Sequence, residues 1–203
     1  MAGGGTLPDN PKFREVSIKS VNPSIVTLAS SGRKQVKTQN AQFWSFTATY
    51  PPMKRSEWAP IAAFIQQQRG SRWDFDIKIE PYSNTQGNLT TETVTVNGAH
   101  DAGDTSVALS SGSLTQTDSL KAGDFVSFAP YQTKVYMVTA DVDFSSGSAT
   151  MNIEPGLLVG VSSSDDLVYK NVEFTVFLNN DVQEWSTGLA NIVEYELEVR
   201  EAI

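Results

Sequence analysis

The sequence contains no cysteine and only one histidine, His100, among its 203 residues. The lack of cysteine excludes disulfides, thiolate metal sites and cysteine nucleophiles. A single histidine excludes metal sites built from several histidines, and serine–histidine catalysis would have to use His100. No apolar run reaches the about 18 residues that a transmembrane helix needs, so we expect no membrane partner. Residues 1–11 have neither the charged nor the apolar segment of a secretory signal.

Positive charge is scarce in the second part of the chain. Residues 1–80 hold 11 Lys and Arg against 6 Asp and Glu, a net charge of +5. Residues 81–203 hold 4 against 17, a net charge of −13. This split predicts head-to-tail attraction between copies, which closes into a ring when the rotation between subunits permits. The alternative is that the fold intermixes both parts and the asymmetry cancels in space. Nucleic acid is an unfavourable partner for so acidic a protein, because phosphate binding needs a concentrated basic surface.

The hydropathy pattern predicts a mainly β protein with one α-helix. Strands are expected near residues 14–20 and 25–28, and a hairpin is expected from residues 33–38 and 43–50 around a turn at 39–40. The helix is expected over about residues 56–69, with Ser56 as its N-cap and Gly70 just after its end. The spacing of its apolar stripe predicts these core positions: Trp58, Ile61, Ala62 and Ile65.

Two later segments alternate strictly between apolar and polar residues. In residues 72–80, one face would carry Trp73, Phe75, Ile77 and Ile79. In residues 192–199, the inward face would carry Val193, Tyr195, Leu197 and Val199. The outward face of this second segment would then be a ladder of three glutamates, Glu194, Glu196 and Glu198.

Composition divides the chain into three parts. Residues 1–12 are rich in Gly, Pro and Asn, and we expect a flexible N-terminal tail. Residues 13–87 and 168–203 are expected to form a β-sandwich body with the helix. Residues 88–167, where short strands alternate with turns, are expected to form an inserted small all-β barrel or sandwich.

Residues with catalytic potential are few. Asp74 and Asp76 are close enough on one strand to suggest glycoside hydrolysis. However, Arg72 and Lys78 flank them on the same face, which favours ordinary surface ion pairs. His100 lies in a predicted turn, where Asp101 could orient it, and no nucleophile motif accompanies it. We therefore expect no enzyme, no catalytic residue, no cofactor and no bound metal.

Tryptophan offers an alternative function. Trp44 and Trp185 could form a stacking platform of a carbohydrate-binding β-sandwich module, whereas Trp58 and Trp73 occupy core positions of their elements. The glutamate ladder, in turn, is too straight for a calcium loop, and a solvated or subunit-facing strand fits it better.

Several segments resemble one family. Residues 31–39, 43–47, 50–53 and 67–71 are similar to the N-terminal β-sandwich of distal tail or baseplate proteins of tailed bacteriophages. Residues 120–128 and 134–141 resemble the inserted β unit of such proteins, and residues 181–188 fit the same group. The resemblance spans about residues 14–200 and has no catalytic motif.

The resemblance implies a virion protein at the distal end of the tail, assembled in the host cytoplasm. It implies a homo-oligomeric ring, expected to be a hexamer, which joins the tail tube to the hub or tip proteins. The charge split adds a hypothesis about the subunit interface. The cations Arg33, Lys34 and Lys37 of one subunit would meet the ladder Glu194, Glu196 and Glu198 of the next.

Overall fold

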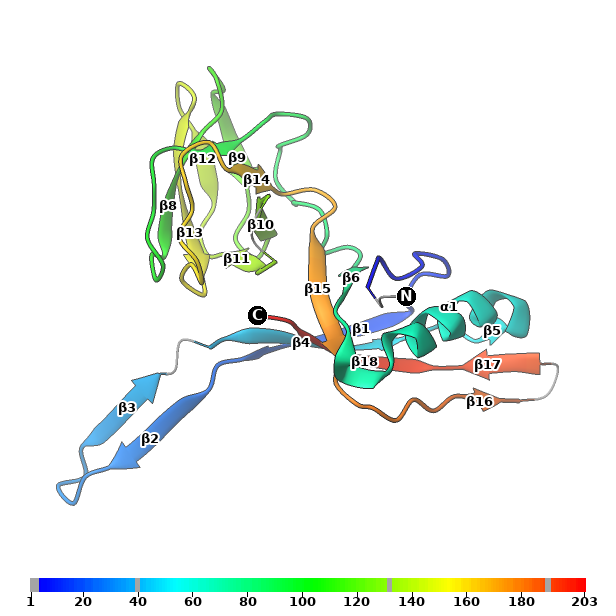
Figure 1. The fold of residues 1–203 in the computed structure, drawn as a ribbon. Coiled ribbons are helices and arrows are strands. Elements are labelled where there is room, and N and C mark those ends of the chain that lie inside the picture. The colour runs from blue at the N-terminus through cyan, green and yellow to red at the C-terminus, as the bar shows by residue number, and fades with distance from the viewer. Residues whose placement is uncertain (1–3, 39–40, 131–132, 189–190) are drawn as a thin grey trace. The chain divides into compact units, whose positions relative to one another are not determined.

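Strands are the main regular structure of the backbone, as the alternating residues predict. The computed structural model describes residues 4–38, 41–130, 133–188 and 191–203. Over these ranges it confirms the predicted fold class, which is mainly β with one α-helix and several sheets, including a closed six-stranded barrel (Figure 1). The chain divides into two compact units, Met1–Asp76 with Val176–Ile203 (unit 1) and Ile77–Thr175 (unit 2).

Unit 1 contains the N-terminal strands, the helix and the C-terminal strands. Its elements are β1 (Glu15–Val21), β2 (Ser24–Leu28), β3 (Lys34–Thr38), β4 (Phe43–Thr49), β5 (Met53–Lys54), α1 (Arg55–Gln68), the 3-10 turn η1 (Gly70–Arg72), β16 (Ser186–Thr187), β17 (Ile192–Glu194) and β18 (Glu196–Glu201). A five-stranded sheet has the order β1-β4-β18-β15-β6, and a three-stranded sheet has the order β16-β17-β5.

The boundaries between the units fall inside two strands of the five-stranded sheet. These strands are β6 (Phe75–Lys78) and β15 (Glu173–Leu178). Composition placed the inserted part at residues 88–167, because the Ser- and Thr-rich segment begins only after β6 has ended. Tertiary contacts also assign residues 77–87 and 168–175, on the two sides of this segment, to unit 2.

The core of unit 1 lies where β4 and β18 pair in the middle of the sheet. On β4, Trp44, Phe46 and Ala48 are buried and alternate with half-buried residues. On β18, Leu197 and Val199 are fully buried, and Val199 lies opposite Phe46. The predicted alternation of the C-terminal run is confirmed, but the run is shared between two sheets, since β17 pairs with β5 and β18 pairs with β4.

Strand pairing near the N-terminus differs from the prediction. The strand at 34–38 pairs with β2, and β4 pairs with β1 over its whole length. The predicted hairpin of 33–38 with 43–50 was therefore wrong, and its turn at 39–40 lies outside the described residues. The reason is that β4 carries buried side chains and lies in the sheet between β1 and the partly buried β18, whereas the described side chains of β2 and β3 are exposed.

Helix α1 begins at Arg55, slightly earlier than expected. Its N-cap is Lys54, whose N–H donates a hydrogen bond to the carboxylate of Glu57 at 2.9 Å. The prediction of Ser56 as the cap was wrong, because Ser56 already lies in the first turn of the helix, and the Glu57 carboxylate accepts from the backbone N–H of the cap Lys54. Among the described residues, no helix is long and apolar enough to cross a bilayer.

The buried face of α1 packs on β5 and β17. Trp58, Ile61 and Ile65 are buried as predicted, whereas Ala62 is only half-buried. Gln68 extends the buried face by one turn. Gly70 follows the helix with φ +69°, as expected of a residue at this position. A side chain there would collide with Asp181, whose carboxylate accepts hydrogen bonds from the N–H and hydroxyl of Ser71.

The N-terminal segment differs from a loose tail in one respect. Residues 5–7 run parallel to β6, where the Leu7 N–H donates to the Asp76 carbonyl and the Asp76 N–H donates to the Gly5 carbonyl, both at 2.9 Å. Leu7 is 6% exposed. One leucine among glycines and prolines is too weak a pattern to predict this contact from the sequence.

Unit 2 is built around the barrel β10-β11-β13-β8-β7-β14. Its strands are β7 (Thr95–Val96), β8 (Ser106–Ser110), β9 (Gln116–Leu120), β10 (Phe125–Ala129), β11 (Tyr136–Val138), β12 (Val142–Phe144), β13 (Ser148–Glu154) and β14 (Asp166–Val168). The core is a single cluster of aliphatic and aromatic side chains, with Val107, Met151 and Tyr136 fully buried. The sequence prediction of a small barrel or sandwich is resolved in favour of the barrel.

Candidate functional site

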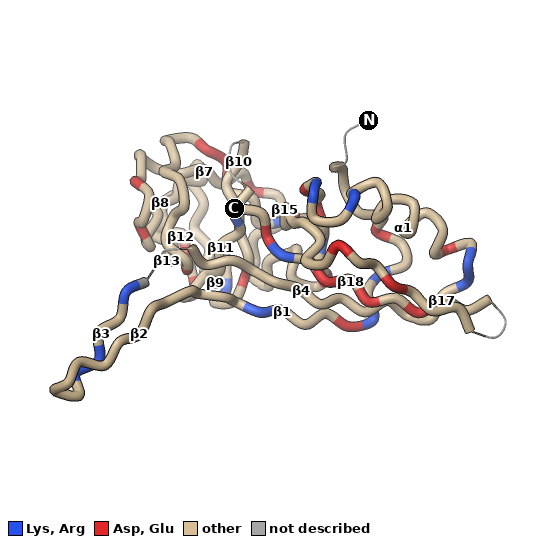
Figure 2. The backbone as a smooth tube through the Cα atoms, turned by 60° about the horizontal axis from the view of Figure 1, so that its bottom comes forward, with Lys and Arg blue, Asp and Glu red and all other residues tan. Residues whose placement is uncertain are grey.

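The β2–β3 ribbon with its turn, residues 24–38, forms a basic hairpin. Arg33, Lys34 and Lys37 lie on it without any acidic residue, as Figure 2 shows. Every side chain described on its two strands is exposed. Among the described residues, none of the three cations has an ion-pair partner.

The basic hairpin also exposes an apolar face. Antiparallel register places Val26 opposite Val36 and Leu28 opposite Lys34. Because side chains alternate between faces, Val26, Leu28 and Val36 share one face, while Ile25 points to the other. The exposed fractions are 53% for Val26, 70% for Leu28 and 50% for Val36, far from the burial that such side chains usually reach.

A groove of about 440 Å³ lies on the same unit where β4 and β17 end. Its lining combines aromatic rings with carboxylates and one cation. The residues are Arg14, Thr49, Tyr50, Pro52, Glu184, Trp185, Ser186, Glu194, Tyr195 and Glu196. We call this surface the acidic groove. The sheet pairing of Ser186 with Glu194 brings its two later segments together.

Aromatic rings pack under the acidic groove. The centroid of Trp58 lies 4.5 Å from that of Tyr195 and 5.7 Å from that of Trp185. Tyr50 lies 6.2 Å from Tyr195. Trp58, Tyr50 and Tyr195 are buried, but Trp185 is 42% exposed and presents an apolar surface to the groove.

The two groove tyrosines differ in hydrogen bonding. The Tyr195 hydroxyl donates to the side-chain oxygen of Gln183 at 2.5 Å. The Tyr50 hydroxyl is buried and, among the described residues, has no hydrogen-bond partner. Burial raises the pKa of both hydroxyls, and for Tyr50 the nearby Tyr195 adds to this effect. A buried hydroxyl without a partner is unfavourable by about 1–3 kcal/mol, so a polar group that enters the groove would gain by reaching it.

The predicted glutamate ladder contributes directly to this surface. Glu194 and Glu196 line the acidic groove, and the Glu196 carboxylate accepts a hydrogen bond from the Thr49 hydroxyl at 3.4 Å. Glu198 lines a neighbouring depression together with Glu184 and Glu196. All three ladder residues are exposed, as expected. Figure 2 shows the acidic positions along β17 and β18.

Sequence reasoning found the charges of the site but not its aromatic part. The sequence predicts Tyr195 to be a core residue. It gives no reason to single out Tyr50 or Glu184. The available signal was the outward Glu194 and Glu196 on either side of the inward Tyr195. Nothing local in the sequence places residues 184–186 beside this run, because that proximity depends on the pairing of β16 with β17.

The tryptophan platform is only partly present. Trp44 is 5% exposed and belongs to the core on β4, so its assignment as a stacking surface was wrong. Trp58 is buried as expected, and Trp73 is half-buried with the Arg72 guanidinium 5.2 Å from its ring centre. Trp185 alone retains the exposure that sugar stacking needs.

The aspartate pair does not form an isolated catalytic site. Asp76 is half-buried on β6 and Asp74 is exposed just before it. Lys78 pairs with Glu173 of the neighbouring strand β15 at 3.4 Å. Lys78 is therefore in an ordinary ion pair, but its partner is Glu173 and not one of the two aspartates that the sequence had favoured.

His100 is a structural residue of the barrel loops in unit 2. Its Nε2 accepts a hydrogen bond from the Ala108 N–H at 3.0 Å, and its Nδ1 lies 3.7 Å from the Asp104 carboxylate. The acid beside the His100 ring is therefore Asp104, four residues later in the chain, and not Asp101. Within the described ranges, no group of three or more His, Asp or Glu side chains is placed to hold a metal.

No protein-family model matches this sequence, and a comparison with curated proteins finds no significant match.

Proposed function

We propose that this protein is a structural subunit of a bacteriophage tail. It would form a homo-oligomeric ring, with six subunits as the expected number, at the distal end of the tail. The ring would join the tail tube to the hub or tip proteins, and the protein would act by shape and surface charge and not as an enzyme. Its place would be the virion, after assembly in the host cytoplasm.

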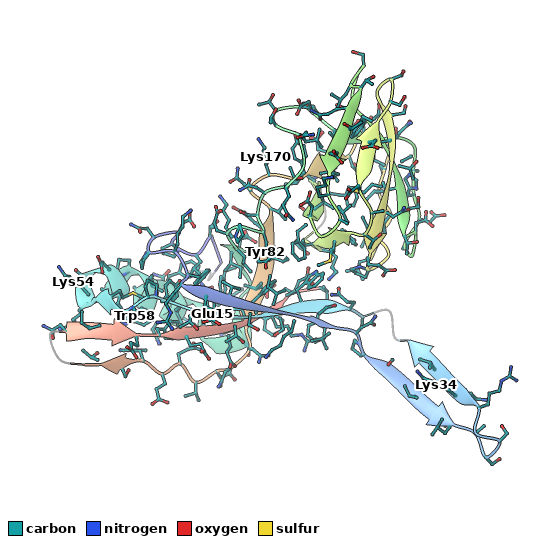
Figure 3. All side chains as sticks on the ribbon, turned by 180° about the vertical axis from the view of Figure 1, so that it is seen from behind. Glu15, Lys34, Lys54, Trp58, Tyr82 and Lys170 are labelled. Carbon is teal, nitrogen blue, oxygen red and sulfur yellow. The ribbon has the colours of Figure 1, made fainter. Side chains whose placement is uncertain are left out.

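The supporting observation is a pair of unmatched charged surfaces on one unit. The basic hairpin carries three cations that have no ion-pair partner among the described residues, and the acidic groove and ladder carry Glu184, Glu194, Glu196 and Glu198. Figure 3 places Lys34 on the hairpin, and Lys54 and Trp58 near the other end of unit 1. Two complementary surfaces at separate places on one unit favour head-to-tail contacts, which close into rings when the rotation between subunits permits. The family resemblance of the sequence supports a tail ring among the possible rings.

A carbohydrate-binding module is the second candidate, and the exposure of Trp185 is the observation that favours it. Sugar sites pair such a ring with hydrogen-bonding groups, and the glutamates of the acidic groove could serve. Titration of tryptophan fluorescence with glycans tests this candidate. A saturable change that is lost in Trp185→Ala would favour it over the ring.

The ring proposal is tested on two levels. Native mass spectrometry and electron microscopy of the purified chain should show a closed oligomer, and its dissociation should increase with salt because exposed charges are screened. Immunogold labelling of virions that contain this chain should mark the tail end farthest from the head. Virions that lack the chain would contradict the tail assignment, even if the purified chain forms a ring.

A further inference from the structure

We propose that the basic hairpin of one copy docks into the acidic groove of a second copy. The inference rests on the proposed self-assembly and names the two surfaces that meet. In this contact, Leu28 packs against the exposed ring of Trp185, and Lys34 pairs with Glu194 and Glu196. The charge split of the sequence does not by itself specify which face of the hairpin meets the partner, nor an aromatic contact; both come from the structure.

The hairpin is the part of the chain that most needs a partner. A lone two-stranded ribbon is marginally stable in water, and this one exposes apolar side chains on both faces. The face with the most apolar side chains holds Val26, Leu28 and Val36. On this face Lys34 lies directly opposite Leu28, near the turn. An apolar side chain beside a cation requires a surface that offers an apolar area next to carboxylates.

The acidic groove offers that combination. Trp185 is 42% exposed, and Glu184, Glu194 and Glu196 surround it. Arg14 also lines the groove and would oppose an incoming cation. The three glutamates outnumber this one cation, so the groove still favours positive charge. Tyr50, whose buried hydroxyl lacks a partner among the described residues, also lines this groove.

The hairpin cannot fill the groove of its own chain. The pairing of β1 with β4 runs from Val21–Phe43, next to the hairpin, to Glu15–Thr49, next to the groove. The seven residues of β4 separate the two ends by roughly 20 Å at the usual rise of a strand. Figure 3 agrees, since Lys34 lies on the hairpin and Glu15 and Trp58 lie away from it. The occupant is therefore a second copy, and the contact is head to tail.

Cysteine cross-linking tests the contact directly, because the chain has no cysteine of its own. Leu28→Cys is mixed with Ser186→Cys, a groove residue, and oxidised. We expect a covalent dimer that forms at least about tenfold faster than with Thr27→Cys, whose side chain lies on the other hairpin face. Equal rates for the two hairpin positions, or no dimer at any protein concentration, would overturn the proposal.

Charge exchange separates this contact from ring formation in general. Lys34→Glu and Glu194→Lys should each raise the dissociation constant of the oligomer about tenfold or more, and the double variant should recover most of the affinity. Lys19→Glu, an equal charge change outside the hairpin, is the matched control. An oligomer that persists unchanged in both single variants would refute the docking but leave the ring, whereas a wild-type monomer without cross-links would refute both.

Discussion

At the residue scale, buried polar side chains decide which contacts are specific. Gln68 is fully buried on the inner face of α1, where its side-chain oxygen accepts a hydrogen bond from the Gly4 N–H at 2.9 Å. Its side-chain nitrogen donates to the Phe64 carbonyl at 3.3 Å. A hydrophobic pattern alone would place an apolar residue here, so the glutamine is explained by the N-terminal segment that it holds.

Replacement of Gln68 by leucine should destabilise the protein. The variant leaves the Gly4 N–H without its acceptor, and we expect a loss of about 1–3 kcal/mol in the free energy of unfolding. Gln67→Leu, at the adjacent exposed position, should change it by less than about 0.5 kcal/mol. Urea unfolding followed by tryptophan fluorescence measures both. A Gln68 variant as stable as the Gln67 variant would show that the Gly4 contact contributes nothing.

Tyr50 and Tyr195 should make the protein less stable at alkaline pH. Burial raises the pKa of both hydroxyls above the usual value near 10. Above that pH, the unfolded chain releases protons that the folded state retains, so unfolding becomes more favourable as pH rises; below it, the two tyrosines have no effect. Each tyrosine should contribute a slope of up to about 1.4 kcal/mol per pH unit.

Tyrosine-to-phenylalanine variants check this slope. Urea unfolding from about pH 8 to about pH 11 should show a smaller alkaline loss in Tyr195→Phe and Tyr50→Phe than in the wild type. At neutral pH the two should diverge, because Tyr195→Phe loses its hydrogen bond to Gln183 while Tyr50→Phe removes a hydroxyl without a partner. Tyr82→Phe, at an exposed position, is the control.

At the scale of elements, the same strand type serves opposite purposes. β4 alternates buried and half-buried residues and lies between two neighbours in the sheet, whereas the side chains described on β2 and β3 are all exposed. β4 has aromatic residues and threonine, and β2 and β3 have isoleucine, valine and threonine, all of which strands favour. The difference is that β4 has a hydrophobic core to cover, and the hairpin has its apolar face turned to solvent.

Removal of the hairpin should leave the fold intact but abolish assembly. In the variant, a short glycine-containing turn replaces residues 24–38. We expect its free energy of unfolding to lie within about 1 kcal/mol of the wild-type value, because the removed side chains bury little surface. Native mass spectrometry should then detect monomers only. Large destabilisation of the monomer would mean that the hairpin packs on its own unit, contrary to its exposure.

At the scale of the whole molecule, two cores are built from one chain. The hydrophobic core of unit 2 is made of buried side chains that all come from residues 89–169. The core of unit 1 combines strands from both ends of the sequence. Each unit therefore has the apolar interior that independent cooperative unfolding needs.

Core substitutions should act on one unit at a time. Leu109→Ala in the barrel and Phe46→Ala in the sheet of unit 1 both remove fully buried side chains, at an expected cost of about 2–5 kcal/mol each. Calorimetry should show one thermal transition lowered in each variant and the other unchanged. If both variants lower a single common transition, the two units unfold as one.

The amino-acid sequence by itself determined the alternation of its strands, the buried stripe of α1 and the outward glutamates Glu194, Glu196 and Glu198. These features are local, since they depend on a period of two or near 3.6 residues and on the requirement that apolar faces be buried. The sequence did not determine the strand ends or the capping residue of α1. The cap is Lys54, two residues before the predicted Ser56, and its N–H donates to Glu57.

Only the tertiary structure decided which strands pair and which surfaces form between them. The exchange of partners that joins β4 to β1 and β2 to β3 follows from burial far along the chain, as does the meeting of Trp185 with Tyr195 through Trp58. The burial of Trp44 and the anchoring of Leu7 have the same origin. Such contacts join residues distant in sequence, and local periodicity carries no information about which distant residue will cover a given face.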